Sequence, residues 1–222
     1  VYDVEQKIEP EKFEINEKKN SEVKLLSWLR EPAKEEGALA KPLTPSHQEE
    51  SLVTALSPLV ENNNEKLYAR GKIIHKMLQF LPSAEEKLRE NLIDNFLEKQ
   101  VSDFDETEKS KIKKEVLELL NNPDFAPLFS QNSVAEVALM GVVGEHIISG
   151  QIDRLVVCDD KVMIVDYKTN RPAAKKLEDV PNAYIKQMRS YKQLVQNIYP
   201  NKKIEAFILW TNTTKIMKLD NL

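Results

Sequence analysis

The spacing of apolar residues changes along the chain from a helical period to a strand period. The first helical stripe consists of Leu67, Ile74, Leu78 and Leu81. Pro82 cannot continue that helix, and Ser83 with Glu86 has the spacing of a capping box for the next one. Asn121-Asn122-Pro123 is a stop signal for a third. We therefore expect three consecutive helices, over about residues 63–81, 83–100 and 106–120.

The strand period begins at Val134. Three segments joined by short polar turns are expected to be strands: 134–143, 145–157 and 162–168. The run Val162–Val165 is apolar on both faces, which is typical of a buried central strand. A helix over 182–198 and two last strands over 204–210 and 215–219 complete the order. This order predicts an α/β fold, a mixed central sheet flanked by helices.

Residues 1–62 have a different composition. They are dense in Glu and Lys and are interrupted by four prolines, so they cannot bury enough apolar surface to fold alone. We expect an extended tether over 1–62 and a folded domain over 63–222. The apolar patch Leu25–Leu29 is an exception within the tether. It either docks on a folded domain or forms a short surface helix. The start at Val1 is what an excerpt of a longer polypeptide, or processing, would give.

Composition narrows the classes of function. The formal charge is -4, so affinity for nucleic acid must come from a local patch rather than from a global basic field. A single cysteine, Cys158, excludes an intrachain disulfide framework and a four-cysteine iron–sulfur or zinc site. This usage fits a reducing cytoplasm. No apolar run has membrane-spanning length, so no membrane partner is expected.

Two expected strands each carry an aspartate, Asp153 and Asp166, and Lys168 follows two positions after the second. Side chains alternate along a strand, so Asp166 and Lys168 share one face and Tyr167 lies on the other. Paired carboxylates bind hard cations such as Mg²⁺, and an ammonium stabilises a developing phosphate charge. The pattern indicates metal-dependent phosphodiester cleavage. The alternative is a set of strand-end salt bridges with neighbouring basic residues.

Further candidates lie near these acids. His75 follows Gly71 by one helical turn and is either a metal ligand or proton carrier, or an ordinary half-buried histidine. Glu145 joins the metal site only if no bulge intervenes before Asp153. Gln187 and Tyr191 share an otherwise apolar helix face.

An amide on such a face needs a hydrogen-bonding partner, either on the active-site strand or on a DNA phosphate. The alternative is a core-edge glutamine beside a packed tyrosine. Thr169, Asn170 and Arg171 directly follow Lys168 and are candidates for contacts with the DNA backbone.

The ordered set of motifs resembles a known family. The set is His75 after Gly71, then Gly150-Gln151-Ile152-Asp153-Arg154, Asp166-Tyr167-Lys168-Thr169-Asn170 and Gln187 with Tyr191. It resembles the RecB-like nucleases of the PD-(D/E)XK superfamily, and among them the nuclease domains that end AddA-type helicase–nucleases. The resemblance covers about residues 64–220. It implies a restriction-endonuclease-like core.

The resemblance also implies functional assignments. His75, Asp153, Asp166 and the carbonyl of Tyr167 are then the ligands of Mg²⁺, with Mn²⁺ as an alternative, and Lys168 is catalytic. Gln187 and Tyr191 match an accessory motif. The expected activity is exonuclease cleavage of single-stranded DNA ends from unwound duplex, during repair of double-strand breaks by homologous recombination. The setting is the bacterial cytoplasm.

The expected partners follow from the same resemblance. They are a partner subunit of the AddB type and an upstream ATP-driven helicase whose phosphate loop this chain lacks. The absence of a four-cysteine set argues against the iron–sulfur nuclease of the AddB type. A second hypothesis is a non-catalytic DNA-binding or subunit-docking module that keeps the nuclease fold. A glycosidase-type carboxylate pair fits less well, because it does not explain Lys168.

Overall fold

The computed structural model describes residues 61–100, 104–144, 146–220 and 222. The expectations for residues 1–60 of the tether, for the patch Leu25–Leu29 and for Glu145 therefore lie outside the described residues, whereas residues 61 and 62 already belong to the first helix. The boundary between residues 62 and 63 stays a prediction. No helix among the described residues is long and apolar enough to cross a membrane.

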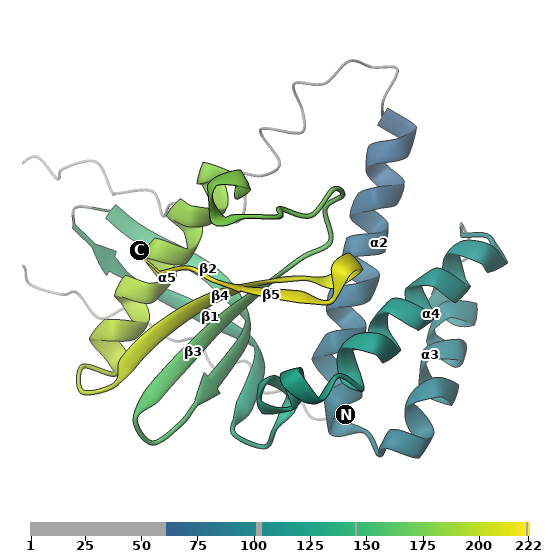
Figure 1. Cartoon of the computed structure of the whole chain (residues 1–222), viewed down its shortest axis with the longest axis horizontal. Coiled ribbons are helices and arrows are strands. Elements are labelled where there is room, and N and C mark those ends of the chain that lie inside the picture. Colours follow the sequence, from purple (N-terminus) through teal and green to yellow (C-terminus); the bar gives the residue numbers. More distant parts are fainter. Residues whose placement is uncertain (1–60, 101–103, 145, 221) are drawn as a thin grey trace, which may run out of the picture. The chain divides into compact units, whose positions relative to one another are not determined.

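A five-stranded sheet forms the centre of the described fold (Figure 1). The strands follow one another in the order β1 (Ser133–Val143), β2 (His146–Val157), β3 (Lys161–Lys168), β4 (Lys203–Trp210) and β5 (Lys215–Lys218). Strands β3 and β4 are parallel, and the other neighbouring pairs are antiparallel. The predicted α/β class with a mixed sheet is confirmed. Strand β3 is central, and Val162, Ile164 and Val165 are fully buried, as its apolar run predicted.

Helices cover both faces of the sheet (Figure 1). Helix α5 (Asn182–Ile198) makes the crossover between the two parallel strands and packs on one face through Met188, Leu194 and Val195. The other face carries α2 (Glu61–Phe80), α3 (Glu86–Gln100) and α4 (Glu106–Leu120). Each face has its own apolar core, because side chains alternate along the strands.

The helices lie where the apolar period predicted them, but the predicted N-cap of the second helix is wrong. Ser83 was expected to cap the second helix. It instead closes a 3₁₀ turn, Leu81–Ser83, and α3 begins only at Glu86. The reason is that Pro82 pre-sets this turn and buries Leu81 in the helical core, which delays the next helix. A second 3₁₀ segment, Pro123–Phe129, follows α4 and packs Phe125 and Leu128 into the same core.

The alternation of side chains shifts by one residue in the middle of β2. Ile148 and Ile152 face the core under α5, but so does Leu155, while Val156 faces the opposite core. The shift falls at Asp153. Its partner position on β1 is Glu136, whose backbone has a φ of 53°. The register of β1 and β2 is the same before and after this position, so no residue is inserted in either strand. The alternation of side chains between the two faces therefore shifts in both strands at once, at Glu136 and Asp153.

Candidate active site

Strands β2 and β3 separate at the position of Asp153. Their last paired residues are Arg154 and Val165. Beyond that point a side chain connects the two strands in place of backbone pairing: Oδ2 of Asp153 accepts a hydrogen bond of 2.6 Å from the backbone N–H of Tyr167. The two strands thus form a fork, with Asp153 on one arm and Asp166-Tyr167-Lys168 on the other.

His75 enters the fork from α2. Its Nδ1 lies 3.3 Å from Oδ1 of Asp153, and its ring packs edge-on against Tyr167 with centroids 5.6 Å apart. Burial opposes charge on the imidazole, but the Asp153 carboxylate outweighs it and raises the pKa of His75 to about 9. Burial likewise works against the Asp153 carboxylate, but His75 and the Tyr167 N–H outweigh it and lower the pKa of Asp153.

Glu136 joins His75 and Asp153 in a group of three side chains that could hold a metal ion, and of these three the sequence reasoning missed only Glu136. One ligand atom each of His75, Glu136 and Asp153 lies within 4.8 Å of the others. Burial, together with the charge of Asp153, raises the pKa of Glu136. Two carboxylates at this distance repel each other unless a cation lies between them. One nitrogen and two carboxylate oxygens form a suitable ligand set for a divalent ion, so the residues fit the metal that the sequence predicted.

Lys168 occupies the opposite side of the fork, in the core under α5. Its Nζ lies 3.1 Å from Oδ2 of Asp166, and it donates to Oε1 of Gln187 at 3.3 Å. The same ammonium lies 4.1 Å from the centroid of the Tyr184 ring, a cation–π distance. Both members of the Asp166–Lys168 pair are at least 90% buried. The lysine is therefore a cation held in place by a carboxylate, an amide and an aromatic face.

Gln187 and Tyr191 connect Lys168 to the neighbouring strand. Nε2 of Gln187 donates to the Tyr191 hydroxyl at 3.4 Å, and that hydroxyl also accepts the backbone N–H of Gln151 at 3.3 Å. Tyr191 fits here because position 150 is a glycine. A Cβ built on Gly150 would lie 2.4 Å from the hydroxyl oxygen. The amide thus has the partner on the active-site strand that its place on an apolar face required.

The family follows from comparison with known proteins. The chain matches the model of the PD-(D/E)XK nuclease superfamily over residues 48–218. It belongs to this superfamily. The D-x-K part of the name corresponds to Asp166-Tyr167-Lys168, at the fork described above. The predicted resemblance is confirmed.

Two curated relatives carry the same name, the A subunit of an ATP-dependent helicase/nuclease. The chain is 25% identical over 173 residues to the protein of Staphylococcus aureus (strain MRSA252), covering 68% of this chain and 14% of the relative. It is 26% identical over 163 residues to that of Staphylococcus epidermidis (strain ATCC 12228 / FDA PCI 1200), covering 63% and 13%. The chain thus spans about one seventh of the length of these relatives. Among solved structures, the chain is similar to the crystal structure of SSO0001. The match covers 60% of this chain and 77% of the SSO0001 chain, with 16% sequence identity and a TM-score of 0.30.

Within this nuclease fold, the candidates from sequence fall into distinct places. His75 and Asp153 are in contact, as a shared ligand role requires. Asp166 is outside the group of three and pairs with Lys168. Tyr167 connects the two sides, because its backbone N–H binds Asp153 while its hydroxyl accepts from Nε of Arg154 at 3.1 Å. Burial raises the pKa of that phenol to about 12.

The loop after Lys168 leaves the site between α2 and α4. Thr169 packs against Gly71, where an added Cβ would meet its Oγ1 at 2.9 Å. Asn170 is exposed. Arg171 reaches α4, where its Nη2 donates to Oε2 of Glu115 at 3.3 Å. Thr169, Asn170 and Arg171 thus directly follow the fork, and their contacts with the DNA backbone stay a prediction.

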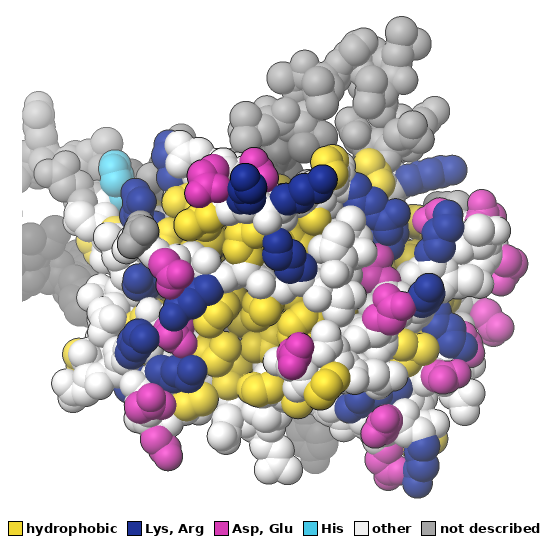
Figure 2. Space-filling view, viewed as in Figure 1, with side chains coloured by type: hydrophobic (Ala, Val, Ile, Leu, Met, Phe, Trp, Pro, Cys, Tyr) yellow, Lys and Arg dark blue, Asp and Glu magenta, His cyan; other side chains and the backbone are white. Residues whose placement is uncertain are grey.

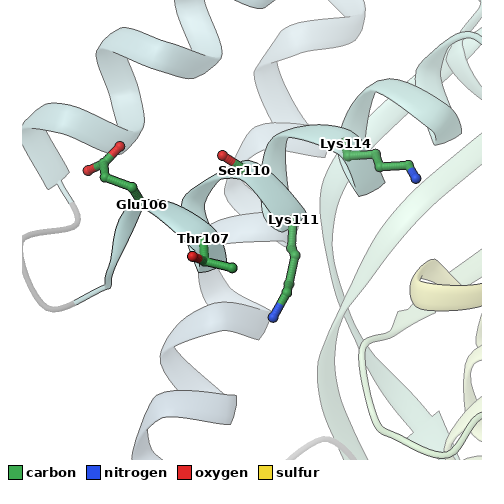
Figure 3. A pocket seen from close by; sticks show the side chains of 5 residues that line it. All are labelled: Glu106, Thr107, Ser110, Lys111 and Lys114. Carbon is green, nitrogen blue, oxygen red and sulfur yellow. The ribbon is translucent and has the colours of Figure 1, made fainter.

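A groove on α4 is separate from this site. Figure 3 shows its lining residues, all from the one helix: Glu106, Thr107, Ser110, Lys111 and Lys114. Its volume is about 480 Å³. Lys111 pairs with Glu108 at 2.6 Å, and Lys114 lies 3.8 Å from Glu118. A groove between paired charges on one helix is a solvated surface, and we assign it no chemistry.

Proposed function

We propose that this chain is a divalent-metal-dependent deoxyribonuclease, the nuclease part of a helicase–nuclease that processes double-strand breaks for recombinational repair. The observation that supports it most directly is the fork itself. Three ligand groups gather on one side and a buried ammonium lies on the other, separated by a single strand end. The names of the Staphylococcus relatives support the helicase–nuclease setting. The proposed partners are single-stranded DNA ends, a protein of the AddB type and an upstream ATP-driven helicase in a bacterial cytoplasm.

We propose His75, Asp153, Asp166 and the Tyr167 carbonyl as the ligands of Mg²⁺ or Mn²⁺, with Glu136 as an added acid. Such an ion, when bound, supplies an activated water and offsets the charge of the phosphate. The remaining chemistry belongs to the chain. The Tyr167 N–H holds the Asp153 carboxylate at the fork, and the Lys168 ammonium lies against Asp166.

Lys168 is the catalytic cation in this proposal. An ammonium buried at the fork stabilises the negative charge that develops on the phosphate oxygens in the transition state, because it acts where water is excluded. Gln187 and Tyr184 restrict its position. Gln187 in turn donates to the Tyr191 hydroxyl, so the accessory motif reaches the lysine.

The test is cleavage of end-labelled single- and double-stranded DNA with Mg²⁺, Mn²⁺ or EDTA. We expect metal-dependent cutting that Asp166→Ala abolishes while the far-UV circular dichroism stays near wild type. The melting temperature should fall but remain well above the assay temperature, because the variant leaves the buried Lys168 ammonium without its carboxylate. Asp159→Ala is the matched control, because Asp159 is an exposed aspartate in the turn between β2 and β3. Full activity in Asp166→Ala would refute the assignment. DNA binding without cutting by wild type would support the non-catalytic module instead.

A further inference from the structure

A buried charged cluster connects the loop after Lys168 to the helical layer. Oε2 of Glu115 on α4 accepts hydrogen bonds from Arg70 on α2 and from Arg171 in the loop. The side chains of Arg70 and Glu115 are only 5% and 8% exposed, whereas that of Arg171 is 46% exposed. One carboxylate is thus shared between a buried and a surface guanidinium.

The cluster carries a net positive charge. Two arginines face one glutamate, and the first of them is nearer to it. Arg70 therefore compensates the buried carboxylate, and Arg171 keeps much of its charge for another anion. A guanidinium suits a phosphate, because its planar donors bind two oxygens at once.

Arg171 also lies in the right place for DNA. It follows Lys168 by three residues. Thr169, between them, packs against Gly71, one helical turn before His75 on α2. On the face seen in Figure 2, basic and acidic side chains are interspersed, and the net charge is -4. Affinity for DNA must then come from a few cations in fixed positions rather than from a broad basic field.

We propose that Glu115 is a positioning residue for DNA binding. It holds the Arg171 guanidinium at the rim of the nuclease site, where Arg171 binds a backbone phosphate next to the one that is cleaved. This inference rests on the proposed function. It assigns to α4, which carries none of the ligand residues, the task of setting the position of the DNA strand.

The sign of one substitution separates this role from simple electrostatics. Glu115→Gln removes a negative charge near DNA, so charge alone predicts tighter binding. Positioning predicts weaker binding, because Arg171 loses the acceptor that orders it. A fluorescein-labelled single-stranded oligonucleotide serves as the probe for the 222-residue chain. The dissociation constant is measured with Ca²⁺ in place of Mg²⁺, and again with EDTA, as a function of salt.

We expect Arg171→Ala to weaken binding roughly tenfold and to lower the salt slope by about 0.7. Glu115→Gln is expected to weaken binding several-fold and to lower the slope in the same direction. The double variant should bind no more weakly than Arg171→Ala alone, because both changes remove one interaction. Glu118→Gln, an exposed glutamate on the same helix, is the matched control and should bind as wild type.

Stability is measured in parallel, because Glu115→Gln leaves Arg70 buried without its partner. Glu115→Asp keeps the charge near Arg70 but shortens the side chain, so it is the second variant if Glu115→Gln does not fold, and it too should bind more weakly than wild type. Unchanged or tighter binding by folded Glu115→Gln overturns the proposal, and so do additive losses in the double variant. Cleavage with Mg²⁺ by wild type is assayed on the same preparation. Absence of cleavage would refute the proposed function, while the binding constants of the two single variants and the double variant would still test the link between Glu115 and Arg171.

Discussion

Replacing Gly150 with alanine tests how closely helix α5 is fitted to the active-site strand. The new Cβ would lie 2.4 Å from the Tyr191 hydroxyl oxygen and 2.6 Å from its Cε1. Tyr191 is fully buried, so the ring has no free space into which to move. The substitution must therefore displace α5 or break the bonds of the hydroxyl with Gln151 and Gln187.

The expected cost follows from these contacts. Overpacking a core by one methyl costs about 1–3 kcal/mol, and the two long hydrogen bonds contribute roughly 1 kcal/mol or less each. A loss near 3 kcal/mol lowers the melting temperature by roughly 6–12 °C in a domain of this size. Gln187 also holds Lys168, so displacing Gln187 moves the lysine. The kcat of Gly150→Ala should therefore fall about tenfold, which corresponds to one lost contact in the transition state, while KM for DNA stays nearly constant.

Thermal melting and steady-state cleavage check this prediction. Gly144→Ala is the control glycine, because a Cβ there meets nothing within 4 Å and only the φ of 61° is strained. It should cost about 1–2 kcal/mol and leave kcat unchanged. Combining Gly150→Ala with Tyr191→Phe removes the closest contact, so the double variant should be more stable than the sum of the two single losses. Wild-type melting and kcat in Gly150→Ala would refute the reasoning.

Three further predictions concern separate parts of the structure. Glu136→Gln should weaken metal affinity by about 10–100-fold in calorimetry, and affinity equal to wild type would remove Glu136 from the site. Tyr184→Leu should lower kcat about fivefold while Tyr184→Phe retains it, because the ring faces Lys168; equal loss in both would point to the hydroxyl. Hydrogen bonds from Lys218 and two other lysines lower the pKa of Glu205 to about 2. Because the pKa of Glu205 is lower in the folded state than the ordinary 4.5, ionised Glu205 stabilises the fold above pH 4.5. This stabilisation is lost as the pH falls towards 2. Glu205→Gln should then lower the free energy of unfolding by about 1 kcal/mol at pH 7, after screening by solvent, and should change it little at pH 2. Denaturant unfolding at both pH values measures this difference, and the same difference at pH 7 and pH 2 would contradict the proposed cause.

Most of the fold could be predicted because the apolar period is local information. The apolar stripe of α2 and the doubly apolar run of β3 each specify the type of one element, and short polar turns separate the strands from one another. The order of these elements then restricts the topology to a mixed sheet with helices on both sides. Only the ends were wrong, as at Ser83, where a proline and a buried leucine decide the conformation together.

The candidate site was predictable in part, for a different reason. Asp153, Asp166 and Lys168 stand out because charged groups at the ends of apolar strands are costly without partners. Glu136 gave no such signal. It lies in an exposed edge strand between two alanine- and valine-rich stretches, and it turns towards Asp153 only because its backbone adopts a φ of 53°.

The sequence by itself determined the elements, their order and the chemical types available at the fork. The tertiary structure decided which of those groups meet. His75 and Asp153 are 78 positions apart, and Arg171 and Glu115 are 56 apart. Contacts at such separations depend on the twist of the sheet and on the shift of side-chain phase at Asp153. Neither leaves a trace in local spacing, because each arises from the packing of the whole sheet between two helical layers.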